Sequence, residues 1–255
     1  MSPSALAGRT VLVTRPPERS GRLVAELERR GARAIAAPAI ALRPVRSAAL
    51  TRAIRELAGG GFAWIVLTSP ATVAMLAERL AGPEEVRARV AAIGDGTADA
   101  FARWAGRTAD IKPRTFTTEG LARAFPRGSG RVLCARADIA PEGLEGTLAA
   151  KGWEPERVDA YRTVFPARLP GPARDALARG AVDAVTFTSA STVRGFVNAV
   201  GAVRGAPKVV CIGPVTAREA RARGLHVHAV ASPHTTDGLI HALERALGRS
   251  RRSVD

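Results

Sequence analysis

The sequence Val11-Leu-Val-Thr-Arg15 returns as Val132-Leu-Cys-Ala-Arg136, at an offset of 132 − 11 = 121 residues. Three further pairs of segments follow in the same order, at offsets of 188 − 68 = 120, 212 − 93 = 119 and 235 − 117 = 118 residues. They are Thr68-Ser-Pro-Ala-Thr-Val73 with Thr188-Ser-Ala-Ser-Thr-Val193, Ile93-Gly-Asp-Gly-Thr-Ala98 with Ile212-Gly-Pro-Val-Thr-Ala217, and Thr117-Thr-Glu-Gly-Leu121 with Thr235-Thr-Asp-Gly-Leu239. Four collinear matches indicate two copies of one unit, each about half of the 255-residue chain.

Short apolar strands alternate with amphipathic helices within each copy. In the first copy the pattern predicts strands at 11–14, 34–37, 64–67 and 90–93, and a weak edge strand at 108–111. It predicts helices at 18–30, 51–57, 72–80, 97–104 and 119–125, and the second copy follows the same order. Strands separated by helices pair in parallel with right-handed crossovers. We therefore expect an α/β fold with two similar open parallel sheets of the flavodoxin or Rossmann kind, each covered by helices on both faces.

Length and composition agree with two domains, because 46% of the residues are hydrophobic and one domain usually spans about 100–200 residues. The net charge is +15, and only three of the 38 basic residues are lysines. This arginine excess has two open explanations, genome composition or a polyanionic partner such as a polycarboxylate or a nucleic acid. The basic residues are spread along the chain, apart from a predicted frayed tail at Arg249–Arg252, and aromatic residues make up only 4%. We expect no specific nucleic-acid binding, which usually requires a defined basic patch with aromatics.

The sequence predicts a cytosolic protein. It contains no apolar run of about 18 residues, so no membrane-spanning helix is expected. Residues 1–8 lack the basic start and apolar stretch of a secretion signal. Cys134 and Cys211 each lie in an apolar, strand-like run, where a cysteine usually packs as a small hydrophobe instead of forming a disulfide.

Several common site motifs are missing from the sequence. There is no Gly-x-Gly-x-x-Gly after the first strand, no Gly-x-x-x-x-Gly-Lys-Ser/Thr and no Gly-x-Ser-x-Gly. His226 and His228 alternate on a predicted strand, but no third ligand lies close in sequence. We therefore predict no metal site and no cofactor. We expect any reaction to depend mainly on the substrate's own reactivity.

The repeated motifs fall where predicted strands end and helices begin. Ser69 and Ser189 each follow a strand, and Gly94 and Gly213 open the next turn. Thr118 and Thr236 precede the last helix of each copy. One explanation is structural, because serine and threonine cap the free N–H groups of a helix start. The other is a binding site, because the same N–H groups and the positive end of the helix dipole attract carboxylates and phosphates.

Taken together, these motifs resemble those of the uroporphyrinogen-III synthase family. Val11–Pro16 matches the family's first strand, and both Thr-Ser-x-x-x-Val and Ile-Gly-x-x-Thr-Ala, present twice, are typical of it. Val158-Asp-Ala-Tyr-Arg-Thr163 matches the family's tyrosine-bearing return strand, and the C-terminal Thr-Thr-x-Gly-Leu is also typical. The similarity runs from about Gly8 to Leu247.

The resemblance implies a domain organisation that the repeat alone does not give. One domain would combine residues 1–40 with 165–255, and the other would span 42–162. Two linker strands near 40–44 and 161–166 would join the domains, with the substrate in the cleft between them. Pro38 and Pro44 bracket the first crossing, where proline disfavours a helix.

The resemblance also implies an activity. In this family hydroxymethylbilane, a linear tetrapyrrole with eight carboxylates, loses its terminal hydroxyl to give an azafulvene. The azafulvene attacks the substituted carbon of ring D, and the spiro intermediate recloses with ring D inverted, giving uroporphyrinogen III. The substrate also cyclises unaided to the isomer without inversion, so the protein must hold the ends in place and assist departure of the hydroxyl.

The family motifs carry site residues over to this chain. Tyr161, its single tyrosine, is the predicted proton donor, because a phenol with an ordinary pKa of about 10 stays protonated at neutral pH. A packing role with a solvated hydroxyl is the alternative for this residue. The predicted carboxylate-binding residues are Arg15, Ser69, Thr97, Ser189, Ser191 and Thr216.

Two positions depart from the family pattern. Asp95 would repel a carboxylate unless its side chain points away, and Ala190 replaces a more usual proline.

Two other functions compete with a synthase. One is a non-catalytic tetrapyrrole or anion sensor of the same fold, although such domains are often joined to a DNA-binding helix-turn-helix and the sequence continues only a few residues past Leu247. The other is a nucleic-acid-binding protein whose affinity falls steeply with salt. For the synthase we expect a monomer in transient contact with the hydroxymethylbilane synthase that supplies its unstable substrate, and no membrane partner.

Overall fold

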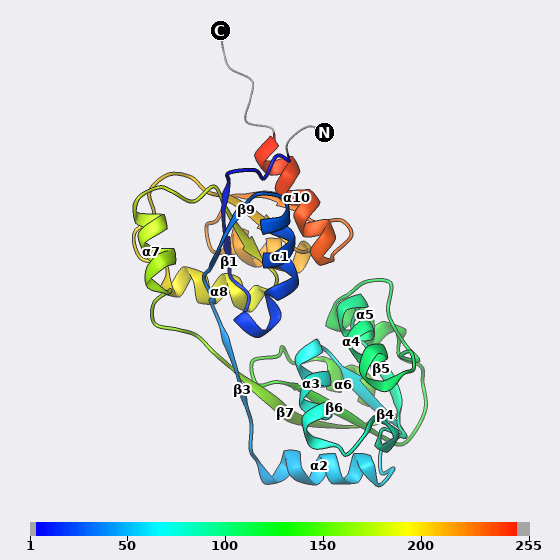
Figure 1. Cartoon of the computed structure of the whole chain (residues 1–255). Coiled ribbons are helices and arrows are strands. Elements are labelled where there is room, and N and C mark those ends of the chain that lie inside the picture. Colours follow the sequence, from blue (N-terminus) through cyan, green and yellow to red (C-terminus); the bar gives the residue numbers. More distant parts are fainter. Residues whose placement is uncertain (1–3, 249–255) are drawn as a thin grey trace. The chain divides into compact units, whose positions relative to one another are not determined.

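The computed structural model describes residues 4–248 of the chain and divides it into two compact units (Figure 1). Unit 1 comprises Met1–Ala41 and Val164–Asp255, and unit 2 comprises Leu42–Thr163. The arginine-rich segment Arg249–Arg252 lies outside the described residues. The chain therefore leaves unit 1 once and returns to it once.

Unit 1 is built on a five-stranded sheet in the order β10-β9-β8-β1-β2, in which neighbouring strands run parallel. Its elements are β1 (Thr10–Val13), η1 (Pro17–Arg19), α1 (Gly21–Arg29), β2 (Arg33–Ala36), α7 (Gly171–Ala178), β8 (Ala184–Phe187), α8 (Ala190–Ala199), β9 (Lys208–Cys211), α9 (Pro214–Ala222), β10 (Val227–Val230) and α10 (Thr236–Gly248).

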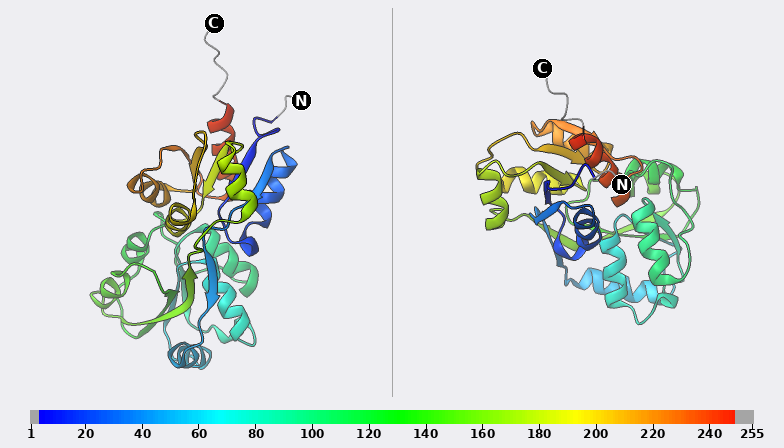
Figure 2. Two further views of the ribbon diagram at one scale, coloured as in Figure 1. Left: turned by 90° about the vertical axis from the view of Figure 1, so that its left-hand side faces the viewer. Right: turned by 45° about the horizontal axis from the view of Figure 1, so that its top comes forward.

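Helices cover both faces of this sheet (Figure 2). On one face Leu23 of α1 and Leu239 of α10 pack with Val11 and Val13 of β1. On the other face α7, α8 and α9 pack against alternate residues of the same strands, among them Leu12. Successive strand residues point to opposite faces, so β1 contributes apolar side chains to both cores.

Unit 2 contains a second five-stranded sheet in the order β3-β7-β6-β4-β5. Its elements are β3 (Ala41–Pro44), α2 (Ala48–Ala58), β4 (Trp64–Leu67), α3 (Pro70–Arg79), η2 (Pro83–Glu85), β5 (Arg89–Ala92), α4 (Asp95–Ala105), α5 (Thr118–Ala124), β6 (Arg131–Ala137), α6 (Leu144–Ala149) and β7 (Glu154–Val164). Helices α2, α3 and α4 cover one face, and α5 and α6 cover the other. The predicted α/β class is thus confirmed.

Each unit combines strands from both copies of the sequence repeat. In unit 1, β1 and β2 come from the first copy and β8, β9 and β10 from the second. In unit 2, β4 and β5 come from the first copy and β6 and β7 from the second. The equivalent strands β1 and β6 therefore occupy equivalent interior positions, each beside the strand that ends in a Thr-Ser motif. The two crossings occur in β3 and at the end of β7, which are neighbours in the sheet of unit 2.

Most predicted elements of the first copy are confirmed to within a few residues, and two differ. The predicted helix at 18–30 starts later, because Pro17–Arg19 form a separate 3-10 turn and α1 begins at Gly21. The predicted strand at 108–111 is reduced to one bridge between Ala91 and Ile111. The predicted strand has only four residues, and Pro113, which cannot donate a ladder hydrogen bond, follows two residues later. The pairing therefore does not extend.

Candidate functional site

Tyr161 and Ser69 lie at the carboxyl edge of the sheet in unit 2. Ser69 follows β4 and is the N-cap of α3, where its side chain accepts a hydrogen bond from the Thr72 N–H at 3.3 Å. The Tyr161 hydroxyl lies 2.8 Å from Ser69 Oγ, at hydrogen-bond distance. The ring of Tyr161 packs against the core cluster beneath α2, α3 and α4. The structure therefore brings together the predicted proton donor and one predicted carboxylate ligand.

A bulge in β7 sets the direction of Tyr161. Arg136 pairs with Asp159, but the next residue of β6, Ala137, pairs with Tyr161, so Ala160 is an extra residue. Bulges of this kind turn a strand locally and re-aim its side chains. Asp138, which directly follows β6, stabilises the bulge with two hydrogen bonds to β7. Its N–H donates to the Tyr161 carbonyl at 3.1 Å, and its Oδ1 accepts from the Thr163 N–H at 2.9 Å. Sequence reasoning missed Asp138, since no motif marks a residue that acts through strand register.

Ser189 and Ser191 lie at the matching position of unit 1, after β8. Ser189 is the N-cap of α8 and accepts from the Thr192 N–H at 3.1 Å, while the Thr192 hydroxyl completes a capping box. Ser191 Oγ lies 2.9 Å from Ser189 Oγ. Both serines are half-buried. The capping explanation holds for Ser189, and its position at a helix start suits anion binding as well.

Thr97 and Thr216 occupy the first turns of α4 and α9, but their side chains are covered. Their residues are only 3% and 4% exposed, respectively. A binding role for these two residues stays a prediction. The first N–H groups of a helix have no partner within the helix, although at the start of α9 Pro214 has no N–H to offer.

The caps of the last helix in each copy are Thr117 and Thr235, whose hydroxyls accept from the N–H groups three residues on. The predicted positions, Thr118 and Thr236, lie one residue later, because two adjacent threonines cannot be distinguished by pattern.

Arg15 follows β1 in unit 1 and is half-buried. Its guanidinium donates to the Thr236 hydroxyl at 3.3 Å, and within residues 4–248 no carboxylate forms an ion pair with it. Burial, together with the nearby charge of Arg19, lowers the pKa of Arg15 from 12.5 to about 10. The side chain therefore stays cationic at neutral pH, at an energetic cost that an anionic ligand would offset.

Arg136, the repeat counterpart of Arg15, is placed very differently. It is 1% exposed and donates to both carboxylate oxygens of Glu145, at 2.9 and 3.0 Å. The residue of the first copy that corresponds to Glu145 is Val24, since 145 − 121 = 24. A change from carboxylate to valine thus leaves Arg15 without the partner that neutralises Arg136. Of the two equivalent arginines, Arg15 is the one available for an anion.

Asp95 is neutralised within unit 2. Its carboxylate lies 2.6 Å from Lys112 Nζ, and this hydrogen bond raises the pKa of the lysine. Lys112 therefore offsets the repulsion expected from Asp95 at the start of α4. The sequence analysis did not predict this ion pair.

Both cysteines are buried, and two of the histidines contact each other at the start of β10. Cys134 and Cys211 are both fully buried, and burial raises the pKa of each thiol to about 12. His228 Nδ1 accepts from the Val209 N–H at 3.1 Å, and the His226 ring stands edge-on to it. Residues 4–248 contain no cluster of three metal-binding side chains.

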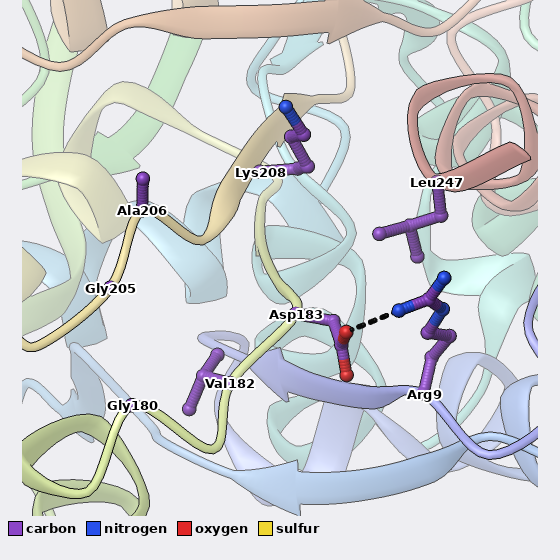
Figure 3. Close-up of a pocket in the computed structure, with 8 residues that line it drawn as sticks. All are labelled: Arg9, Gly180, Val182, Asp183, Gly205, Ala206, Lys208 and Leu247. Atoms are coloured by element: carbon purple, nitrogen blue, oxygen red, sulfur yellow. Dashed lines mark hydrogen bonds and ion pairs between the residues drawn. The ribbon is translucent and has the colours of Figure 1, made fainter. Parts of the chain in front are cut away.

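A separate hollow lies at the opposite end of the sheet in unit 1 (Figure 3). Its polar walls include Arg9, which forms an ion pair with Asp183 at 2.8 Å, and Lys208 at the start of β9. Its volume of about 180 Å³ is below the range of about 300–1,000 Å³ that small-molecule sites usually occupy. None of the predicted site residues lines it.

Within the described part of the chain, no helix has the length and apolar character needed to cross a membrane.

Comparison with known proteins gives consistent results. The family model described as "Uroporphyrinogen-III synthase HemD" matches residues 21–241. A uroporphyrinogen-III synthase from Synechococcus elongatus is 30% identical, over 96% of this chain and 98% of its own. Two solved structures share the fold. A mutant uroporphyrinogen III synthase from Thermus thermophilus is 24% identical with a TM-score of 0.66, covering 95% of this chain and 100% of that one. The uroporphyrinogen-III synthetase from Helicobacter pylori is 18% identical with a TM-score of 0.63, covering 94% of this chain and 99% of that one. From the sequence motifs, the fold and these matches, the chain belongs to the uroporphyrinogen-III synthase family.

Proposed function

We propose that this protein converts hydroxymethylbilane into uroporphyrinogen III and water, with inversion of ring D, as a lyase of tetrapyrrole and haem biosynthesis. The observation that carries the chemical part of the proposal is the Tyr161–Ser69 contact at the carboxyl edge of a parallel sheet. Such edges are where open α/β sheets bind ligands. A phenol there, in a chain of this family, supplies the single proton donor that the reaction needs.

The groups proposed to bind the substrate's carboxylates are one arginine, the hydroxyls at a helix start and the N–H groups of helix first turns. Arg15 is a half-buried cation without an acidic partner in residues 4–248, and a carboxylate would relieve the cost of its burial. Ser189 and Ser191 stand at the start of α8, where the helix dipole favours negative charge, and the start of α3 offers the same dipole beside Ser69. Thr97 and Thr216 would contribute through the N–H groups of their turns.

In the proposed reaction the Tyr161 hydroxyl protonates the departing hydroxyl of hydroxymethylbilane, which leaves as water. The substituted carbon of ring D attacks the methylene of the resulting azafulvene, and the spiro intermediate breaks and recloses with ring D inverted. The final closure releases one proton from ring D, which restores the phenol of Tyr161. The protein's main contribution is positional, because binding energy at the carboxylates holds the two ends in a geometry that the free substrate rarely adopts. No cofactor is needed for these steps.

A coupled assay tests the proposal. Porphobilinogen and a hydroxymethylbilane synthase are incubated with the purified protein, and the products are oxidised and separated as isomers I and III. We expect mainly isomer III, and isomer I when this protein is omitted. Isomer I alone from a folded, monodisperse sample would contradict the proposal and favour the sensor of the same fold. A monomeric state, a cytosolic location and transient contact with the hydroxymethylbilane synthase stay predictions.

A further inference from the structure

The geometry points to Ser69 as a positioning residue that donates its hydroxyl hydrogen to Tyr161 in the reacting complex, and not as a carboxylate ligand. The donation would complete a chain of hydrogen bonds from the N-terminus of α3 to the phenol. This inference rests on the proposed function, because it assumes that Tyr161 protonates the departing hydroxyl. It assigns Ser69 a different role from the one that the family motif predicts.

The hydrogen-bonding capacity of Ser69 supports this role. A serine hydroxyl has one hydrogen to donate and two lone pairs to accept with. One lone pair accepts the Thr72 N–H at 3.3 Å, as the N-cap of α3. The Ser69 hydrogen is left for another acceptor, and Tyr161 Oη, at 2.8 Å, is closer than the Thr72 hydroxyl at 3.4 Å.

The direction of the Ser69–Tyr161 bond decides what the phenol can do. If Tyr161 donated to Ser69, its hydrogen would be engaged in that bond. If Ser69 donates instead, the Ser69 contact does not use the phenolic hydrogen, and Tyr161 can donate it to the departing hydroxyl when substrate binds. The bonds Thr72 N–H to Ser69 and Ser69 to Tyr161 then run in one sense, so each polarises the next. A donor aimed at the phenolic oxygen also stabilises the negative charge that develops there as the proton leaves.

The second copy of the repeat shows that the contact is not a by-product of capping. Ser189 is the same N-cap on α8, yet its hydroxyl lies against Ser191 at 2.9 Å and not against a phenol. The residue of the first copy that corresponds to Ser191 is Ala71, since 191 − 120 = 71. Because Ala71 has no hydroxyl, Ser69 lacks that competing partner and its hydroxyl contacts Tyr161 instead.

The test separates the hydroxyl from the cap. Glycine caps a helix nearly as well as serine, so Ser69→Gly removes the hydroxyl at a small cost to α3. The matched control is Ser47→Gly, which removes the same kind of cap from α2 of unit 2, where Ser47 accepts from the Leu50 N–H at 3.1 Å. We expect Ser69→Gly to lower kcat about tenfold, the effect of one charge-stabilising hydrogen bond, with little change in KM. Ser47→Gly should leave both unchanged.

A second readout does not depend on turnover. Because Tyr161 is the only tyrosine, biosynthetic 3-fluorotyrosine places one fluorine in the protein. Its ¹⁹F resonance should move in Ser69→Gly and stay in place in Ser47→Gly.

The outcomes distinguish this inference from the proposed function. A higher KM with unchanged kcat in Ser69→Gly would make Ser69 a carboxylate ligand and overturn the positioning role. Unchanged kinetics and an unmoved resonance would also overturn it. If Tyr161→Phe lowers kcat while Ser69→Gly does not, the positioning role alone fails. If the wild-type protein yields only isomer I, the proposed function fails first.

Discussion

Arg15 and Arg136 occupy equivalent positions of the repeat but differ in their partners. We therefore expect the same substitution to have opposite effects on stability at the two positions. Replacing each arginine by methionine removes a cation but keeps a long apolar side chain. Arg15 has no carboxylate partner in residues 4–248, so Arg15→Met removes a desolvated charge. Arg136 is buried against Glu145, so Arg136→Met leaves a carboxylate without its partner. We expect Arg15→Met to stabilise the protein and Arg136→Met to destabilise it.

The pKa of Arg15 sets the scale of the first effect. A shift from 12.5 to about 10 corresponds to roughly 3.4 kcal/mol against the charged form at pH 7, at about 1.36 kcal/mol per pH unit. This is an upper value, because the methionine also loses the hydrogen bond to Thr236. We expect a gain of about 1–3 kcal/mol in the free energy of unfolding, or a Tm higher by about 3–8 °C.

The second effect follows from the burial of the Arg136–Glu145 pair, whose side chains are 1% and 18% exposed. Removing one partner of a buried pair costs about 3–5 kcal/mol, which lowers the Tm by roughly 10 °C. Differential scanning calorimetry measures both variants. Tryptophan fluorescence reports unit 2 separately, because Trp64, Trp104 and Trp153 all lie there.

Under the proposed function, Arg15→Met should also raise the KM for hydroxymethylbilane, because it removes a proposed carboxylate ligand. If Arg15→Met destabilises the protein as much as Arg136→Met does, Arg15 is a structural residue and its assignment to substrate binding is wrong.

Three further predictions concern single groups. Tyr161→Phe should keep the fold and its Tm but lower kcat by about 10²-fold or more, the usual loss for a general acid; unchanged turnover removes Tyr161 from the mechanism. Cys134 and Cys211 should not react with a thiol reagent at pH 8 until the protein unfolds, because both thiols are buried with a pKa of about 12; rapid modification of the native protein would contradict this. The hydrogen bond from Arg29 is the main cause that lowers the pKa of Glu26 to about 2, so its contribution to stability is present above about pH 4.5 and is lost as pH falls toward 2. Glu26→Gln should therefore flatten the loss of stability between pH 5 and pH 2 in urea unfolding, and an unaltered pH profile would refute this.

Local sequence patterns were sufficient to predict the helices and strands, but not which strands pair with one another in a sheet. The apolar run Trp64–Leu67 followed by Thr-Ser predicts a buried strand and a capped helix, because both depend on residues close in sequence. Which strands share a sheet depends on contacts more than a hundred residues apart, such as the pairing of β1 with β8. The repeat shows that the strands are equivalent but does not say which copy each one joins.

The same limit applies to the site residues. The sequence places Arg15 and Arg136 at identical motif positions, and only the distant contact with Glu145 separates a neutralised arginine from an available one. Thr97 and Thr216 carry the motif, yet the helix geometry turns both side chains inward. Tyr161 is identified by the resemblance, whereas its contact with Ser69 spans 92 residues and requires the folded sheet. Side-chain direction and long-range pairing are therefore what the sequence leaves open.

Competition between catalysed and spontaneous ring closure tests the proposed function most directly. Preformed hydroxymethylbilane is mixed with increasing amounts of the wild-type protein and of Tyr161→Phe, and the fraction of isomer III is measured at each concentration. We predict that isomer III rises with wild-type protein until it replaces isomer I, and that Tyr161→Phe needs far more protein for the same fraction. Isomer I at every concentration of folded wild-type protein would contradict the central claim that this chain directs the inversion of ring D.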